Sequence, residues 1–96
     1  MELTHEEENN KGIFYFGTVD DKLGSLTYRL TDPNLMIIRH TVVDEKMKGQ
    51  NLGRKLVDAA ADYARSREMK IHPECTYAHA VFKKNESQYA DVWQKD

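Results

Sequence analysis

The sequence predicts an α+β fold, in which a mixed, mostly antiparallel twisted sheet packs against one long helix and one or two short C-terminal helices. Two observations support this prediction. The first half of the chain contains runs of aromatic and β-branched residues bounded by polar turns, which is typical of strands. After residue 51 the apolar residues recur every three or four positions, which is typical of a helix. The 96 residues fit one compact domain, which we expect to span residues 1–96.

The first segments predict three strands in succession. The polar stretch ELTHEEE (2–8) is expected to form an edge strand, and GIFYFGTV (12–19) a strand rich in aromatic side chains. DDKLG (20–24) predicts a turn. In SLTYRLT (25–31), apolar and polar residues alternate, which indicates an antiparallel strand buried on one face. The residues of that inward face are Leu26, Tyr28 and Leu30.

The segment LMIIRHTVV (35–43) is an almost continuous apolar run and predicts a central strand. A turn, DPN (32–34), precedes it, because Asp and Asn favour turn conformations and Pro fixes φ. Alternation along the strand predicts that four residues share one face, namely Met36, Ile38, His40 and Val42.

A helix is predicted to begin at Asn51 or Leu52. Its apolar stripe has helical spacing and consists of Leu52, Leu56, Ala59, Ala60 and Tyr63. Arg54 and Asp58 form an i,i+4 pair of opposite charge on its flank. MKIH (69–72) predicts a short strand parallel to the preceding one, because the helix crosses between them.

The C-terminal part predicts a second helix and a folded tail. CTYAHAVFKK (75–84) has the helical pattern, with three residues turned inward, Ala78, Val81 and Phe82. The tail contains Tyr89, Val92 and Trp93, which we expect to fold back on the core as one apolar turn.

The composition limits the class of protein. Hydrophobic residues make up 40% and charged residues 31%, as in soluble globular proteins, and no apolar run could span a bilayer. The acidic N-terminus is unlike a secretory signal, and the single Cys75 excludes an internal disulfide, so we expect a cytoplasmic protein. A net charge of −2 argues against nucleic acid or a membrane as partner.

The segment DEKMKGQNLGRKL (44–56) concentrates positive charge at the predicted start of the helix. Its cations are Lys46, Lys48, Arg54 and Lys55. The unpaired N–H groups of a first helical turn form an anion site. Gly49 permits close backbone approach, Asn51 tolerates a left-handed conformation, and Gly53 lets another group pack against the first turn. A diphosphate matches these successive donors; a solvated basic face without a ligand is the alternative.

Two motifs extend this interpretation, RHTVVDEKMKGQNLG (39–53) and KIHPECTYAHAVFKK (70–84). Over roughly residues 12–93 the chain resembles the GCN5-related N-acetyltransferase (GNAT) superfamily, and more closely a small bacterial branch of it. These proteins have a Q/R-x-x-G-x-G/A turn between the fourth strand and a long helix, which cradles the pyrophosphate of acetyl-coenzyme A. The resemblance implies a GNAT-like fold with acetyl-coenzyme A (acetyl-CoA) as the cofactor.

The resemblance also implies cofactor-binding positions. The six places of the turn and the residue after it correspond to Lys48, Gly49, Gln50, Asn51, Leu52, Gly53 and Arg54. Val42 and Val43 stand where family members offer backbone groups to the pantetheine arm. Two places depart from the pattern, since Lys48 replaces Gln or Arg and Asn51 replaces Gly. Phe82 stands where many members have the tyrosine that protonates the leaving thiolate, and phenylalanine has no proton to give.

Three residues are candidates for the chemistry, Cys75, His40 and His79. Cys75 opens the second helix, where the dipole lowers a thiol pKa, and His79 follows one turn later as a base or ion-pair partner. Cys75 could accept the acetyl group, line the thioester pocket, or be a small buried thiol. His40 lies on the strand from which family members supply a general base, although its apolar neighbours also fit packing. No metal site is predicted, because His72, Cys75 and His79 have uneven spacing and no fourth ligand.

We therefore expect an N-acetyltransferase that transfers acetyl from acetyl-CoA to an unidentified small-molecule or peptide amine, as a monomer or weak dimer. The alternative is a non-catalytic CoA-binding or protein-interaction module on a GNAT scaffold. Phe82 and the missing N-terminal helices of the family favour that alternative. A nucleic-acid-binding role for the basic turn is disfavoured by the acidic overall balance.

Overall fold

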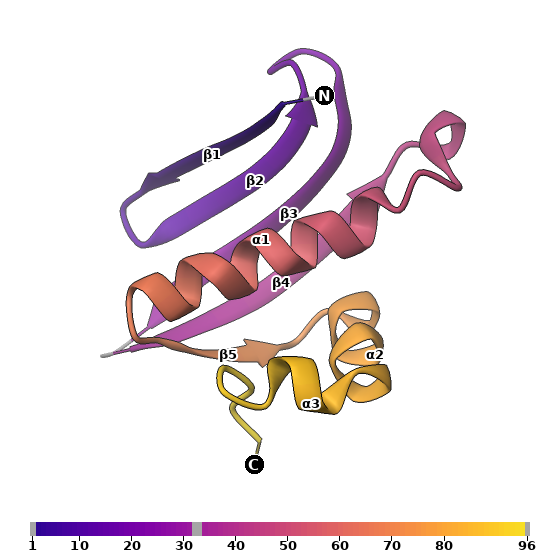
Figure 1. Cartoon of the computed structure of the whole chain (residues 1–96). Coiled ribbons are helices and arrows are strands. Elements are labelled where there is room, and N and C mark those ends of the chain that lie inside the picture. Colours follow the sequence, from indigo (N-terminus) through magenta and orange to yellow (C-terminus); the bar gives the residue numbers. More distant parts are fainter. Residues whose placement is uncertain (1, 32–33, 96) are drawn as a thin grey trace.

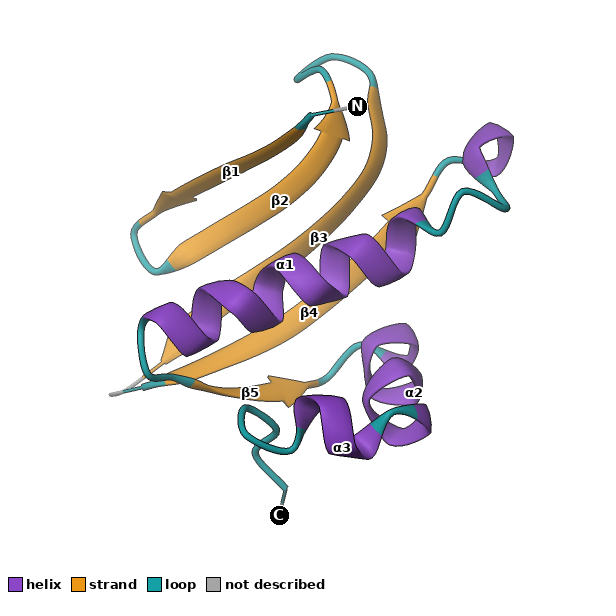
Figure 2. Ribbon diagram, in the orientation of Figure 1, coloured by secondary structure: helices purple, strands orange, loops and turns teal. Residues whose placement is uncertain are grey.

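The structure, a computed structural model, describes residues 2–31 and 34–95. In these ranges it contains one five-stranded sheet, in the order β1-β2-β3-β4-β5, and three α-helices (Figure 1). The strands are β1 (Leu3–Glu8), β2 (Lys11–Gly17), β3 (Lys22–Thr31), β4 (Leu35–Val43) and β5 (Lys70–Pro73). The helices are α1 (Leu52–Ser66), α2 (Thr76–Lys84) and α3 (Glu86–Tyr89), with a 3₁₀ turn, η1 (Glu45–Met47), before α1. Figure 2 shows the predicted α+β combination of a mixed sheet, one long helix and two short C-terminal helices.

The topology follows the prediction, with one turn shorter than expected. Strands β1 to β4 pair antiparallel with their neighbours, and β4 pairs parallel with β5, as a crossover through α1 predicts. The predicted N-terminal edge strand is confirmed as β1. The turn predicted at 20–24 is too long, because β3 already begins at Lys22 and the turn is closed by hydrogen bonds between Thr18 and Asp21. The turn predicted at 32–34 includes residues 32 and 33, which lie outside the described residues.

The core lies between α1 and the sheet face that α1 crosses (Figure 1). Leu26 and Tyr28 of β3 face α1 and are buried, as alternation predicts, and Leu30 packs at their edge. The predicted helical stripe supplies the facing side chains Leu52, Leu56 and Ala60. Burial of each large apolar side chain stabilises the fold by about 1.5–3 kcal/mol. Among the described residues, no helix has both the length and the hydropathy that a membrane-spanning segment requires.

A β-bulge interrupts β4 at Arg39. Thr27 of β3 pairs with His40 and Tyr28 pairs with Ile38, so Arg39 has no partner on β3. One extra residue reverses the alternation of the side chains that follow it. The prediction that His40 and Val42 share a face with Met36 and Ile38 is therefore wrong.

Beyond the bulge, Thr41 and Val43 face α1, because they pair with the α1-facing residues Leu26 and Gly24. His40 and Val42 point to the opposite side of the sheet, which we call the open face. This face comprises, among others, Thr27, Arg29, His40 and Val42.

The C-terminal residues fold back on the sheet, as predicted. Tyr89 and Val92 are buried. Backbone hydrogen bonds join Ile71 of β5 to Val92 and Gln94, at 2.6 and 2.8 Å, so the tail covers the outer edge of β5.

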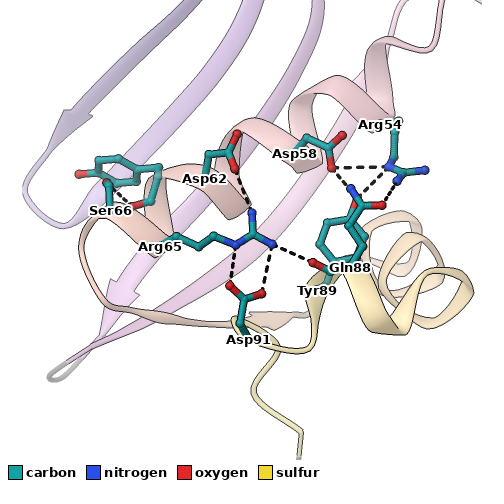
Figure 3. A network of polar contacts seen from close by, with 9 residues as sticks. Arg54, Asp58, Asp62, Arg65, Ser66, Gln88, Tyr89 and Asp91 are labelled. Atoms are coloured by element: carbon teal, nitrogen blue, oxygen red, sulfur yellow. Dashed lines mark hydrogen bonds and ion pairs between the residues drawn. The ribbon is translucent and has the colours of Figure 1, made fainter.

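Two arginines of α1 hold α3 and the tail against it (Figure 3). Arg54 Nε donates to the Tyr89 hydroxyl at 2.7 Å and pairs with Asp58 at 3.5 Å, which confirms the predicted i,i+4 pair. Arg65 binds both carboxylate oxygens of Asp91, at 2.7 and 3.1 Å. These contacts, one in the first turn of α1 and one in the last, therefore fix α3 and the tail along the length of that helix.

Candidate functional site

The turn between η1 and α1 has the backbone that the sequence predicts. Asn51 precedes α1 in the left-handed conformation, with φ of 62°, and its side chain makes no capping hydrogen bond within the described residues. Gly49 has φ of +87°, which glycine adopts without strain. Apart from its chain neighbours, no described atom lies within 4 Å of the position that a Cβ would occupy there. The N–H groups of the first turn of α1 therefore lack an intrahelical partner and a side-chain cap.

A cavity of about 290 Å³ lies at this end of α1, between the turn, β4 and α2. Its lining residues are Thr41, Val43, Met47, Lys48, Gly49, Asn51, Leu52, Gly53 and Tyr77. Six of them are positions that the sequence assigns to the cofactor, and Thr41, Met47 and Tyr77 are additional. Lys48, the one cation of this set, forms an exposed ion pair with Glu45 at 3.2 Å. The cavity is thus lined by anion-binding groups, namely the helix start and Lys48, and by apolar side chains such as Val43 and Met47.

Three predicted cofactor residues do not line this cavity. Val42 lies on the open face, 62% exposed, and Gln50 is exposed beside the turn. Arg54 is directed toward α3, where it donates to Tyr89 and, at 2.6 Å, to the side-chain oxygen of Gln88 (Figure 3). The packing of α3 therefore takes Arg54 away from the turn that precedes it.

Tyr77 is the residue of this site that sequence reasoning missed. It projects from the first turn of α2 against Gly53, and a Cβ at position 53 would lie 2.6 Å from its hydroxyl. The prediction that Gly53 lets another group pack against the first turn is confirmed, and Tyr77 is that group. The signal in the sequence was Gly53 itself, which required a partner that the chain order does not reveal.

Strands β4 and β5 separate beside the cavity. They pair only as far as Ile38 and Pro73 within the described residues. The Ile38 carbonyl accepts hydrogen bonds from the backbone N–H groups of Glu74 and Cys75, both at 3.1 Å. Residues 39–43 of β4 therefore keep backbone groups on the side away from β3 that no strand of the sheet pairs with. We call this opening the β4–β5 gap.

Cys75 lies at the gap as the N-cap residue of α2. Its half-buried thiol makes a weak hydrogen bond with Thr41 Oγ1 at 3.5 Å. Burial alone raises the pKa of this thiol, but the nearby N–H groups of Ala78 and Tyr77, which point toward a negative charge there, and the Thr41 hydroxyl outweigh burial and lower the pKa below its ordinary value. Because Thr41 lines the cavity, the thiol lies just behind the cavity wall.

The structure does not bring His79 to Cys75. The His79 ring packs edge-on against Trp93, with centroids 5.9 Å apart, and lines a second cavity of about 360 Å³. Tyr77 and His79 are two positions apart on α2, so they face different sides of that helix. Among the described residues no hydrogen bond or ion pair links His79 to the thiol.

The remaining candidates occupy separate places. His40 is exposed on the open face, opposite Thr27. Phe82 is fully buried and stacks on Tyr89, with ring centroids 4.5 Å apart, which makes it a core residue. Residues 2–31 and 34–95 contain no group of three or more side chains placed to hold a metal ion.

The family model that matches the chain is that of the GCN5-related N-acetyl-transferase, over residues 14–92. Among solved structures, a GCN5-like N-acetyltransferase candidate from Staphylococcus aureus is 35% identical, with a TM-score of 0.76. That alignment covers 98% of this chain and 90% of the other. A search of curated proteins found no match.

Larger proteins share the fold at low sequence identity. An aminoglycoside acetyltransferase from an uncultured soil metagenomic sample is 16% identical with a TM-score of 0.64, covering 93% of this chain and 62% of that one. The ribosomal-protein-S18-alanine N-acetyltransferase of Escherichia coli is 14% identical with a TM-score of 0.64, covering 81% and 53%. This chain therefore spans between half and two thirds of these two proteins.

Proposed function

Because the chain belongs to the GCN5-related N-acetyl-transferase family, we propose that it transfers an acetyl group from acetyl-CoA to a small-molecule or peptide amine. The observation that carries this proposal is the cavity at the start of α1, where uncapped N–H groups, two glycines and Lys48 adjoin the β4–β5 gap. The proposal treats residues 1–96 as one acetyltransferase domain. The free thiol of Cys75 supports a reducing, cytoplasmic setting.

The residues of the cavity fit the two ends of acetyl-CoA. We assign its diphosphate to the first turn of α1 with Gly49, Gly53 and Lys48, since successive N–H donors and a cation satisfy phosphate oxygens. We assign its pantetheine arm to residues 39–43 of β4, whose backbone groups at the gap have no strand partner. Acetyl-CoA supplies the acetyl group as an activated thioester.

The gap presents two residues that can serve the transfer. The amine nitrogen bonds to the acetyl carbonyl carbon, the carbon–sulfur bond breaks, and the amine proton passes to a base. On a direct route that base is His40, which is exposed on the open face. On a covalent route the Cys75 thiolate accepts the acetyl group first and passes it to the amine. The lowered pKa of Cys75 supports a thiolate at this place.

The leaving thiolate needs a proton, which Phe82 cannot supply from the core. The hydroxyls that line the cavity are those of Thr41 and Tyr77. We assign the donor role to Thr41, because it lies beside Cys75 at the gap and accepts rather than donates in its hydrogen bond with that thiol, whereas the Tyr77 hydroxyl lies against Gly53 in the turn assigned to the diphosphate.

An amine acceptor is also supported by the proteins of the same fold. Their names give an aminoglycoside and a ribosomal-protein alanine as acceptors, and both are amines. A CoA-binding module without turnover is the second candidate function, which the position of Phe82 in the core favours.

A titration with acetyl-CoA, followed by amide NMR shifts, tests the proposal. We expect saturable shifts at residues 47–54 and at Cys75, and release of free CoA thiol once an amine is added. Binding without release by any amine would favour the module without turnover. Absence of binding at millimolar acetyl-CoA would contradict both functions.

A further inference from the structure

Two buried polar atoms without partners lie at the β4 bulge. Among the described residues, Thr27 Oγ1 and Arg39 Nε are the only buried side-chain nitrogen or oxygen atoms that lack a hydrogen bond. Thr27 pairs with His40, and Arg39 is the extra residue of the bulge, so both atoms belong to the same place in the sheet. An unpaired buried polar group costs about 1–3 kcal/mol, so these two atoms need an explanation, and a functional role at this place is one.

Arg39 has a carboxylate neighbour that does not satisfy it. Its Nε lies 3.0 Å from Glu74 Oε1, yet the N–H group is not directed at that oxygen, so the ion pair leaves the N–H without an acceptor. The backbone N–H of Glu74 donates to the Ile38 carbonyl, which holds Glu74 at the end of β5. The whole side chains of Arg39 and Glu74 are 39% and 54% exposed, so a small molecule can reach the end of the guanidinium and the carboxylate, although Nε itself is buried.

This pair adjoins both candidate catalytic residues. His40 follows Arg39 on β4, and Cys75 follows Glu74 at the start of α2. The pair therefore borders the β4–β5 gap, through which an acceptor must reach the acetyl group. A molecule held by Arg39 and Glu74 would therefore lie at the rim of this gap.

The opposite charges of Arg39 and Glu74 lie about 3 Å apart. They are therefore complementary to a compound whose positive and negative groups are equally close together. In an α-amino acid the amine and the carboxylate are attached to one carbon. Glu74 can accept hydrogen bonds from the ammonium form, while the exposed end of the Arg39 guanidinium can donate to the carboxylate. The charged groups of a polyamine or an aminoglycoside are all positive, so Arg39 would repel them.

We propose that the Arg39–Glu74 pair selects the acceptor and that this acceptor is an amine with an adjacent carboxylate, as in a free amino acid. This inference rests on the proposed acetyltransferase function. His40 would take the proton that the amine loses when its nitrogen bonds to the acetyl carbon, and the sulfur would leave with the electrons of the broken bond.

The first test compares L-phenylalanine with 2-phenylethylamine, which differ only in the carboxylate, at saturating acetyl-CoA. We expect kcat/KM to be at least about tenfold higher for phenylalanine. Arg39→Gln should abolish this preference by lowering the value for phenylalanine alone, and Glu74→Gln should lower both values. Arg29→Gln is the matched control, because Arg29 is exposed on the same face, two residues along β3 from Thr27, and should leave the ratio unchanged.

A second test needs no variant. Wild-type protein loaded with CoA is titrated with each compound, and the Nε–H signal of Arg39 is followed by NMR. Phenylalanine should shift this signal and 2-phenylethylamine should not. Equal kcat/KM for the two compounds, or a preference for spermidine, would overturn the inference and leave the proposed function intact. Failure of CoA to shift residues 47–54 would overturn the proposed function itself, and with it the inference.

Discussion

The hydroxyl of Tyr77 lies so close to Gly53 that a methyl group added to Gly53 would come within 2.6 Å of it. The contact joins the first turn of α2 to the first turn of α1, and both residues line the cavity assigned to acetyl-CoA. The absence of a side chain at position 53 therefore sets the width of the cavity at the helix start.

Gly53→Glu should abolish acetyl-CoA binding while the protein remains folded. The new side chain displaces the tip of Tyr77, which is 42% exposed and free to move, and places a carboxylate where we assign the diphosphate. Like charges at such a site cost several kcal/mol, so affinity should fall by about 100-fold or more. Calorimetric titration measures the affinity. Gly53→Gln, which has the same size without the charge, is the control and should bind more tightly than Gly53→Glu.

Cys75→Ala separates the two routes of transfer. On the direct route this variant keeps its turnover, whereas His40→Ala lowers kcat by about 100-fold or more. On the covalent route Cys75→Ala loses turnover, and wild-type protein incubated with acetyl-CoA alone carries an acetyl group on Cys75. Turnover assays and intact-protein mass spectrometry give the answer. Acetyl-CoA affinity should be unchanged in both variants on either route.

The Cys75 thiol should react with iodoacetamide at lower pH than a thiol of the unfolded chain. Its pKa is lowered in the folded protein because the N–H groups of Ala78 and Tyr77 and the Thr41 hydroxyl favour the thiolate by more than burial disfavours it. The thiolate therefore stabilises the fold above the unfolded-state pKa, and this stabilisation is lost as pH falls through the folded-state pKa. Thr41→Val should raise the midpoint of the pH–rate profile. Identical midpoints for folded and denatured protein would contradict the assignment.

Tyr89→Phe should destabilise the protein by about 1–3 kcal/mol, because it leaves Asp58 and Arg54 without the buried hydroxyl that they share. Burial, and then the hydrogen bond to Asp58, raise the pKa of Tyr89 to about 12. A raised pKa means that the stabilisation is complete below the unfolded-state pKa of about 10 and is lost as pH rises through the folded-state value. Urea unfolding at pH 8 and at pH 11 measures this effect. The variant should lose less stability than wild type between these two pH values.

Local patterns predicted most of the secondary structure. Each pattern reflects burial within a single element, as in the alternation of β3, the apolar run of β4 and the stripe of α1. Such patterns can therefore be recognised without knowledge of the fold. The left-handed Asn51 was also predictable, because few residues other than glycine adopt that conformation easily.

The features that sequence reasoning did not reveal depend on pairing between elements. Nothing in RHT marks Arg39 as an extra residue, because a bulge is defined only by its partner strand. Arg54 belongs to the basic turn in sequence, but Tyr89 and Gln88 from the distant α3 bind its guanidinium. The His79 ring likewise packs against Trp93 of the tail, a contact between distant parts of the chain. Tyr77 was missed because only the packing of α2 on α1 brings it to Gly53.

The two edges of the sheet differ in how they resist association with other chains. At β1, Glu6 and Glu8 are exposed. If a second copy paired with this strand, its own glutamates would lie beside them, and the like charges would repel. At β5, the hydrogen bonds of Ile71 with Val92 and Gln94 already occupy the outer backbone groups. A substitution that detaches the tail would therefore leave the outer backbone groups of Ile71 unpaired and open this edge to association with another chain, even where α1 and its cavity remain intact.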